Sequence, residues 1–231
     1  MRTLKTKIGF VLLILVCTSC FEIKEILNLR KDGTGTYQFV VDMSQSRAML
    51  AMLENLGDQD STSVETEEAK ESSPFDDMDE SFQATKERLE AIEGIINVQS
   101  IKDEDALQFG VQFEFLTVYA LNKALNRLDE DKGALEKEEV FFAFSKKTFE
   151  RFNTKNFTED LMKNAGMGED SLNVAMFFKD LSYTTSYTMP KKVKSMTNPD
   201  ATLSDDKRTV DVTYYPFRGE DEPNFSNKIK F

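Results

Sequence analysis

Few side chains in this sequence could carry out chemistry on their own. The two cysteines, Cys17 and Cys20, lie close together near the N-terminus, and the chain has no histidine. Without histidine it lacks the commonest general base, the usual zinc ligand and the base of a Ser-His-Asp triad. Two kinds of chemistry stay open. One is reaction at a cysteine thiolate. The other is acid–base work by two of the 41 acidic residues, for instance on a glycan.

The cysteines directly follow a segment with the pattern of an export signal. Residues 1–7 are short and basic, and residues 8–16 read IGFVLLILV, a continuous apolar run. A basic region followed by such a run is typical of a secretory signal peptide. The run is about half the ~20 residues that a membrane-spanning helix needs. The alternative is an uncleaved anchor helix, which the polar and charged residues that follow almost at once make less favourable.

The segment Val16-Cys17-Thr18-Ser19-Cys20 resembles the lipobox of bacterial lipoproteins. The resemblance implies that a signal peptidase cuts between Ser19 and Cys20, that the Cys20 thiol receives a diacylglyceryl group, and that the new amine is often acylated. The family usually has leucine three residues before the cysteine, and Cys17 stands there instead. A cut that made Cys17 the first residue would put Leu15 and Val16 before it, and neither is small.

Lipid on Cys20 would fix the location of the protein. Each buried methylene contributes ~0.8 kcal/mol, so two or three acyl chains make the anchor effectively permanent. Phe21 follows the cysteine, whereas in Gram-negative lipoproteins an aspartate there tends to retain the protein in the inner membrane. The resemblance therefore implies a lipid-anchored protein of the bacterial cell envelope, in the outer membrane rather than the inner. The expected domains are a signal peptide over residues 1–19 and one α+β domain over residues 20–231.

Composition excludes some partners. The chain is 40% hydrophobic with 19 phenylalanines, enough for a sizeable core, and its net charge is −12. A phosphate backbone would on average repel such a chain, so we expect no nucleic-acid binding. Residues 58–80 are rich in Asp, Glu, Ser and Thr and predict a disordered acidic insertion. Neither this segment nor the run Asp129-Glu130-Asp131 has the spacing of a calcium loop, so we expect no metal and no cofactor.

Hydrophobic periodicity predicts the elements of the mature chain. A period of two indicates a first hairpin around Asp32-Gly33 and further strands downstream. In the first strand Glu25 and Ile26 break the alternation. Strands are expected near residues 21–30, 37–43, 96–101, 107–115, 140–144, 183–189, 210–214 and 227–231, and helices near 44–56, 81–93, 118–128, 158–165 and 171–176. The expected fold is α+β, an antiparallel sheet of roughly six to eight strands with helices packed on one face.

Basic residues alternate with phenylalanines in one later segment, over residues 146–157. Lys146, Lys147, Arg151 and Lys155 lie there among Phe149, Phe152 and Phe157. This pattern can bind single-stranded nucleic acid. Because the whole chain is acidic, we expect phenylalanines in the core and lysines in solvent instead.

The order of these features resembles a loosely defined group of bacterial lipoproteins with an LppM-like domain. The resemblance is carried by three segments, which are 32–35 (Asp-Gly-Thr-Gly), 121–125 (Leu-Asn-Lys-Ala-Leu) and 187–193 (Tyr-Thr-Met-Pro-Lys-Lys-Val). It implies an α+β domain at the envelope and brings no catalytic residues.

Three functions fit the sequence. The first, which we expect, is a non-enzymatic envelope lipoprotein that binds a partner protein or helps to maintain the envelope. The second is a carrier of a lipid or other apolar ligand. The third is a carboxylate-based enzyme acting on glycans. A carrier should have an interior apolar cavity, an enzyme two buried carboxylates in a cleft, and a binding module an exposed apolar patch.

Overall fold

The computed structural model describes residues 21–46, 83–128, 138–152, 180–216, 218 and 224–231. Several expectations fall on residues outside these ranges. They are the signal peptide with Ser19 and Cys20, most of the helix expected after Ser44, the acidic segment 58–80, and the helices expected at 158–165 and 171–176. These stay predictions.

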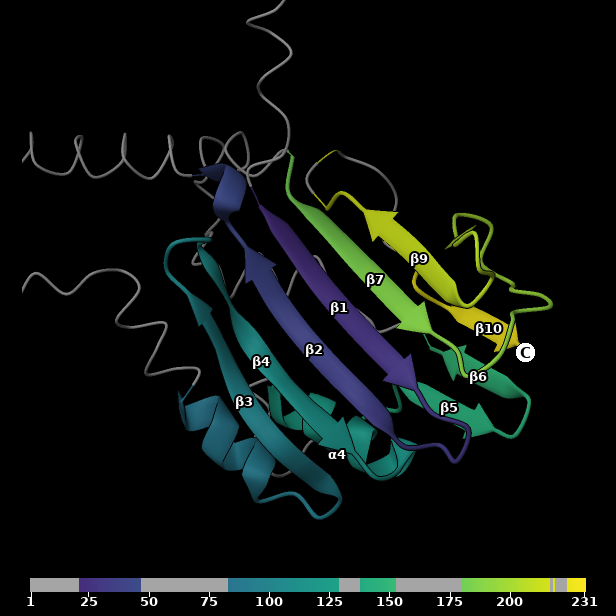
Figure 1. Cartoon of the computed structure of the whole chain (residues 1–231), viewed down its shortest axis with the longest axis horizontal. Coiled ribbons are helices and arrows are strands. Elements are labelled where there is room, and N and C mark those ends of the chain that lie inside the picture. The colour runs from purple at the N-terminus through teal and green to yellow at the C-terminus, as the bar shows by residue number, and fades with distance from the viewer. Residues whose placement is uncertain (1–20, 47–82, 129–137, 153–179, 217, 219–223) are drawn as a thin grey trace, which may run out of the picture.

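A seven-stranded sheet is the largest element of the fold (Figure 1). Its strand order is β3-β4-β2-β1-β7-β9-β8. The first hairpin is confirmed, with Gly33 in the left-handed region (φ 89°) of the turn between β1 and β2. The strand bounds are β1 Glu22–Leu29, β2 Gly35–Asp42, β3 Ile95–Asp103, β4 Gln108–Phe115, β7 Ser182–Thr188, β8 Thr202–Leu203 and β9 Thr209–Tyr214.

The expectation of a purely antiparallel sheet is wrong. Strand β1 pairs with β7 in parallel, from Glu22 opposite Ser182 to Asn28 opposite Thr188. The other pairs in this sheet are antiparallel. Alternation predicts which face of a strand is buried but carries no information on strand direction, so the sequence pattern could not reveal the parallel pair.

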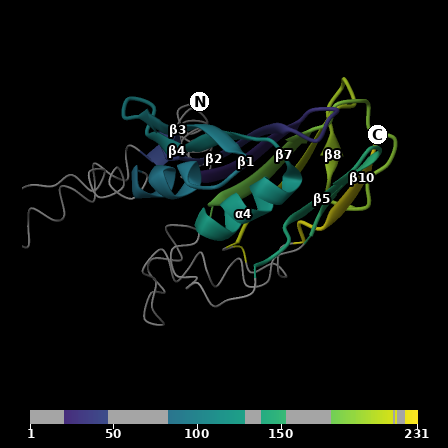
Figure 2. The same ribbon diagram turned by 90° about the horizontal axis from the view of Figure 1, so that it is seen from below.

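The second layer is only partly helical. It contains α4 (Val118–Leu128) and a three-stranded sheet of order β10-β6-β5, both on the same side of the large sheet (Figure 2). The strands of this small sheet are β5 Phe142–Ser145, β6 Thr148–Arg151 and β10 Asn227–Lys230. A short helix over residues 83–90 adds the fully buried Leu89 to the same core. Helices alone were expected on this face, so the small sheet is a correction.

The core lies between the two layers. Phe142 and Phe149 of the small sheet stack with ring centroids 5.2 Å apart, and Tyr187 of β7 meets both rings edge-on at 5.7 and 5.9 Å. From α4, Leu121 and Leu125 pack into the same cluster. Each large apolar side chain buried in this way contributes roughly 1.5–3 kcal/mol, so the second layer is held mainly by its apolar contacts.

Candidate functional site

The predicted site residues Ser19 and Cys20 lie just before the first described residue. Phe21 already extends the pairing of β1 with β7, because its carbonyl oxygen accepts a hydrogen bond from the amide of Ser182 at 3.0 Å. Phe21 alone separates the predicted attachment residue Cys20 from the start of β1 at Glu22.

The face of the large sheet that points away from the second layer is mostly polar. No described helix or strand covers it (Figure 2). Its side chains pair across strands, as in Thr184 with Thr213 at 3.1 Å and Thr188 with Thr209 at 3.0 Å. This face, which we call the outer face, arises because the strands alternate polar and apolar residues.

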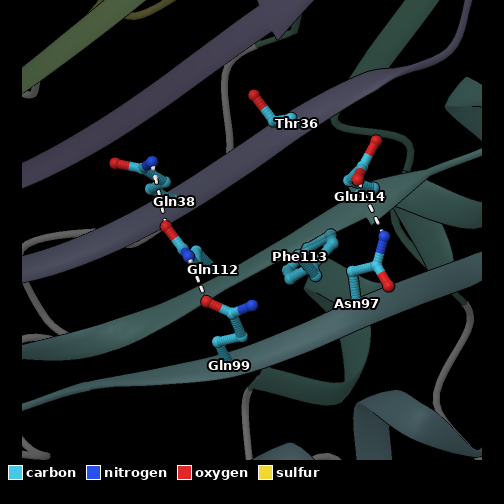
Figure 3. Close-up of a pocket in the computed structure, with 7 residues that line it drawn as sticks. All are labelled: Thr36, Gln38, Asn97, Gln99, Gln112, Phe113 and Glu114. Carbon is cyan, nitrogen blue, oxygen red and sulfur yellow. Dashed lines mark hydrogen bonds between the residues drawn. The ribbon is translucent and has the colours of Figure 1, made fainter.

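A groove of about 160 Å³ lies on the outer face at its β3 end (Figure 3). A β-bulge creates it, since the β3–β4 register shifts between Ile96 and Gln99. Within the bulge Asn97 has a positive φ of 54°, a conformation that asparagine adopts more easily than most residues. The groove is lined by Thr36, Gln38, Asn97, Gln99, Gln112, Phe113 and Glu114.

Three glutamines form a hydrogen-bonded ladder along one side of the groove. Gln38 Nε2 donates to Gln112 Oε1 at 3.2 Å, and Gln112 Nε2 donates to Gln99 Oε1 at 2.7 Å. The ladder crosses β2, β4 and β3 and ends on the outermost strand (Figure 3). It fixes the orientation of each amide, so the groove presents ordered donors and acceptors.

On the other side of the groove, the negative charge of the Glu114 carboxylate is balanced by the positive charge of Arg30. This carboxylate accepts hydrogen bonds from Arg30 Nη2 at 2.6 Å and from Asn97 Nδ2 at 2.8 Å. These two hydrogen bonds lower the pKa of Glu114. The carboxylate therefore stays ionised at neutral pH and is matched by the Arg30 charge, so the groove favours no strongly charged ligand.

Two exposed apolar side chains lie beside the groove. Ile96 is 41% exposed and faces Glu114 across the β3–β4 pair. Leu116, 49% exposed, follows β4, and its amide donates to the carbonyl oxygen of Gly94 at 2.8 Å. A polar groove next to exposed apolar residues is common where a protein binds another molecule.

A second hollow, of about 340 Å³, lies near the end of β9. Tyr214, Tyr215 and Phe225 contribute to it. The Arg218 guanidinium lies 3.8 Å from the centre of the Tyr215 ring and pairs with Asp180 at 3.1 Å. This hollow is mixed in polarity and opens at the surface.

The inner face of the large sheet holds a buried polar cluster. Glu25 of β1 is 2% exposed and accepts hydrogen bonds from the hydroxyls of Tyr183 at 2.6 Å and Tyr187 at 2.7 Å. Arg151 of β6 approaches it, with Nη2 3.5 Å from Glu25 Oε2. The Arg151 guanidinium also lies 4.9 Å from the centre of the Phe142 ring. This cluster joins the large sheet to the small one.

Burial and neighbouring charges together shift the pKa values of the tyrosines and the arginine in this cluster. Burial, followed by the Glu25 charge, raises the pKa of Tyr183 and Tyr187 well above the ordinary value. Burial by itself lowers the pKa of Arg151, but the charges of Glu25 and of the phenols raise this pKa overall. The phenols therefore stay protonated and the arginine charged, which keeps Glu25 fully partnered.

The sequence pattern missed most of these residues. The expectation of solvated lysines is confirmed for Lys146 and Lys147, but it gave no sign that Arg151 is buried, with 4% of its surface exposed. Its strand, β6, has four residues, too few to show a clear period. For Glu25 a signal was present, because the break in alternation stands at a core-facing position of β1. The groove depends on pairing between distant strands, so no local pattern could reveal it.

The described residues contain no group of three or more acidic or cysteine side chains placed to hold a metal ion. Across the same part of the chain, no helix is long and apolar enough to cross a membrane. Glu25 is the one buried carboxylate there, so the paired carboxylates of a glycosidase cleft are not seen among these residues.

The fold and groove describe a mixed α+β domain with an open polar sheet face. No family model matches the chain, and no curated protein does. Among solved structures, the folded domain of LppM from Mycobacterium tuberculosis, determined by NMR, is similar with a TM-score of 0.43 and 9% identity. The match covers 93% of this chain and 91% of that domain. Similarity at this level transfers no residue and no activity.

Proposed function

We propose that this chain is a lipid-anchored protein of the bacterial envelope that works by binding a partner protein rather than by catalysis. Lipid on Cys20 would hold it to the membrane, the outer membrane in preference to the inner. The export pattern and lipobox-like segment of residues 1–20 support the anchor. The outer face and its groove support the binding role.

The observation that carries this proposal is the position of the groove relative to the two ends of β1. Gln38 and Thr36 pair with Ile26 and Asn28, at the far end of the strand from Phe21. At about 3.3 Å per residue the groove is roughly 20 Å along the sheet from the attachment point. A lipid at Cys20 would leave this part of the outer face open to a partner.

No observation favours the other two candidates. A carrier needs an enclosed apolar cavity, whereas the two hollows described above are open and hold polar side chains. A glycan-acting enzyme needs two carboxylates around a cleft, and within the described ranges Glu25 is buried beneath the sheet without a second one.

The proposal is tested by cross-linking in intact cells. A photoreactive amino acid at Gln112, in the groove, should form a covalent adduct with one partner protein. The same amino acid at Thr209, on the outer face but beyond β7, is the matched control and should give little adduct. Replacing Ile96 with aspartate should weaken the Gln112 adduct, because it places a charge at the apolar rim. Equal labelling from both positions, or none from either, would contradict the proposal.

A further inference from the structure

Strand β3 is the outermost strand on the groove side of the large sheet. It has nine residues, whereas β8 at the opposite edge has two. Among the described strands only β4 pairs with it, so the backbone groups on its other side have no strand partner there. A long edge strand can receive another chain as an additional strand, and natural proteins usually protect such edges.

The β-bulge divides this edge into two parts. The bulge at Asn97 distorts the start of the strand, which hinders pairing by a long, flat strand such as another copy of the sheet edge. Beyond it, Gln99 to Asp103 keep an unbroken register with β4. A segment of about five residues can therefore pair in regular geometry at this edge.

The glutamine ladder ends at this same edge with unused hydrogen-bonding groups. Gln99 Oε1 accepts from Gln112, but no hydrogen bond within the described part of the chain uses Gln99 Nε2. In Figure 3 this nitrogen faces the groove on the side of Asn97, whose own carbonyl oxygen has no described partner either. An amide donor and an amide acceptor thus lie unused on the same margin of the sheet, although the Asn97 oxygen points away from Gln99 in Figure 3.

Other ligand classes fit these groups less well. Phe113 at the floor is 2% exposed, so no open aromatic ring is available for a sugar to stack on. Arg30 already pairs with Glu114, so an anion gains no free cation here. The far end of β3 is acidic, with Asp103 and Asp105 near the Lys102–Glu104 ion pair of 3.1 Å. These charges favour a neutral or basic segment.

We propose that β3 receives an extended segment of a partner protein as an added strand along Gln99 to Asp103. One acceptor-bearing side chain of that segment binds Gln99 Nε2 in the groove, and an apolar side chain packs on Ile96. This rests on the proposed function, since it names how the partner of the outer face is held. Main-chain pairing provides affinity in such complexes, and side chains at alternate positions provide specificity.

The test uses the full chain, with its anchor, in detergent micelles. The probe is a phage-displayed library of random linear peptides, from which enriched peptides are synthesised. We expect them to slow backbone hydrogen exchange at residues 99–103. Gln99→Leu should weaken their binding about five- to tenfold, as loss of one hydrogen bond does. The matched control Thr184→Val removes a hydroxyl from the cross-strand pair with Thr213, on the outer face but away from the groove, and should leave binding within about twofold.

The outcomes separate this inference from the proposed function. Protection at residues 99–103 that depends on Gln99 supports strand addition. Peptides that protect another surface, or that bind Gln99→Leu as well as the unaltered chain, overturn it. A library without enriched binders, or binding of free glycans by the groove in place of peptides, overturns it as well. In each of these cases cross-linking at Gln112 still decides whether the outer face binds a partner.

Discussion

Glu25 and Arg151 carry opposite charges in a place that water does not reach. The Glu25 carboxylate has two phenol donors, and the arginine has the carboxylate and the carbonyl oxygen of Phe152, bound at 3.2 Å. The Arg151 Nε atom is buried without a hydrogen-bond partner among the described residues. Such a network contributes little net stability while complete, but loss of one member leaves a buried charge uncompensated.

We therefore expect Glu25→Gln to be strongly destabilising. The amide keeps the shape of the side chain but leaves the Arg151 charge without its counter-ion. The free energy of unfolding should fall by about 3 kcal/mol, as measured by urea denaturation. Glu22→Gln, on the same strand but in an exposed ion pair with Lys24, should cost less than about 1 kcal/mol.

A double variant, Glu25→Leu with Arg151→Met, should destabilise the protein less than the sum of the two single variants. Equal effects at Glu25 and Glu22 would refute the interpretation.

Stability should also fall at high pH because of the buried phenols. The pKa of Tyr183 and Tyr187 is raised in the folded state, so above about pH 10 the unfolded chain releases protons that the folded chain retains. The contribution is complete below about pH 10 and is lost as the pH rises further, by up to roughly 1.4 kcal/mol per pH unit and phenol. Unfolding free energies measured from about pH 8 to pH 11 should show this slope. Replacing Tyr183 and Tyr187 with phenylalanine should reduce it to the part due to Tyr37, whose pKa burial also raises.

A surface lysine provides the control for that experiment. Partial burial by itself lowers the pKa of Lys24, but hydrogen bonds to Asp42 and Glu22 raise this pKa overall. Loss of the Lys24 proton at high pH therefore also lowers the stability of the folded state. Lys24→Gln should therefore remove only a small part of the slope, since the group is partly exposed and screened by solvent. A slope that disappears with Lys24 and persists without the phenols would assign the effect to the surface.

At the scale of elements, helix α4 holds the small sheet through two asparagines. Asn122 Oδ1 accepts from the amides of Phe141 at 3.0 Å and Phe142 at 2.9 Å, and its Nδ2 donates back to the Phe142 carbonyl oxygen. One helical turn later, Asn126 makes the same two-way contact with the backbone of Glu139. Asn122 thus pairs with the start of β5, and Asn126 pairs with the backbone that leads into it, each as a neighbouring strand would.

We expect Asn122→Ala to loosen the small sheet more than the large one. Its backbone partners at residues 141 and 142 would be left unsatisfied, at a cost of about 2–3 kcal/mol. Hydrogen exchange of amides in β5 and β6 should speed up, with little change in β1 and β2. Arg127→Ala, an exposed change on the same helix, should leave all four strands unaffected. Uniform loss of protection across both sheets would mean that the two layers open together.

Sequence patterns predicted most elements but few of their partners. The alternation of Phe109, Phe113 and Phe115 predicts β4 because each core-facing residue is apolar. The same rule predicts β7 through Tyr183 and Tyr187, although it does not reveal that their hydroxyls meet on one carboxylate. Pairings between strands far apart in sequence, and hence the small sheet and the groove, arise from tertiary packing that local periodicity does not encode.

At the scale of the whole molecule, the proposed lipid anchor at Cys20 predicts where the protein is found. We expect Cys20→Ser to move the chain from the membrane fraction to the soluble envelope fraction, or to block its maturation, and to abolish labelling by a radioactive fatty acid. Cys17→Ser should leave both properties unchanged, because Cys17 lies in the segment expected to be removed. If labelling were lost in Cys17→Ser and kept in Cys20→Ser, the lipid would be attached to Cys17 instead.

The parallel pairing of β1 with β7 also sets the order in which the molecule can assemble. Glu25 and Tyr183 are 158 residues apart. At synthesis rates of ~5–20 residues per second, β7 leaves the ribosome on the order of ten seconds after β1. Strand β2 can pair with β1 early, but the other edge of β1 must wait for the last third of the chain. A truncated product that ends before β7 would therefore carry an open strand edge beside an unpartnered Glu25, and such a fragment should be prone to aggregation and proteolysis.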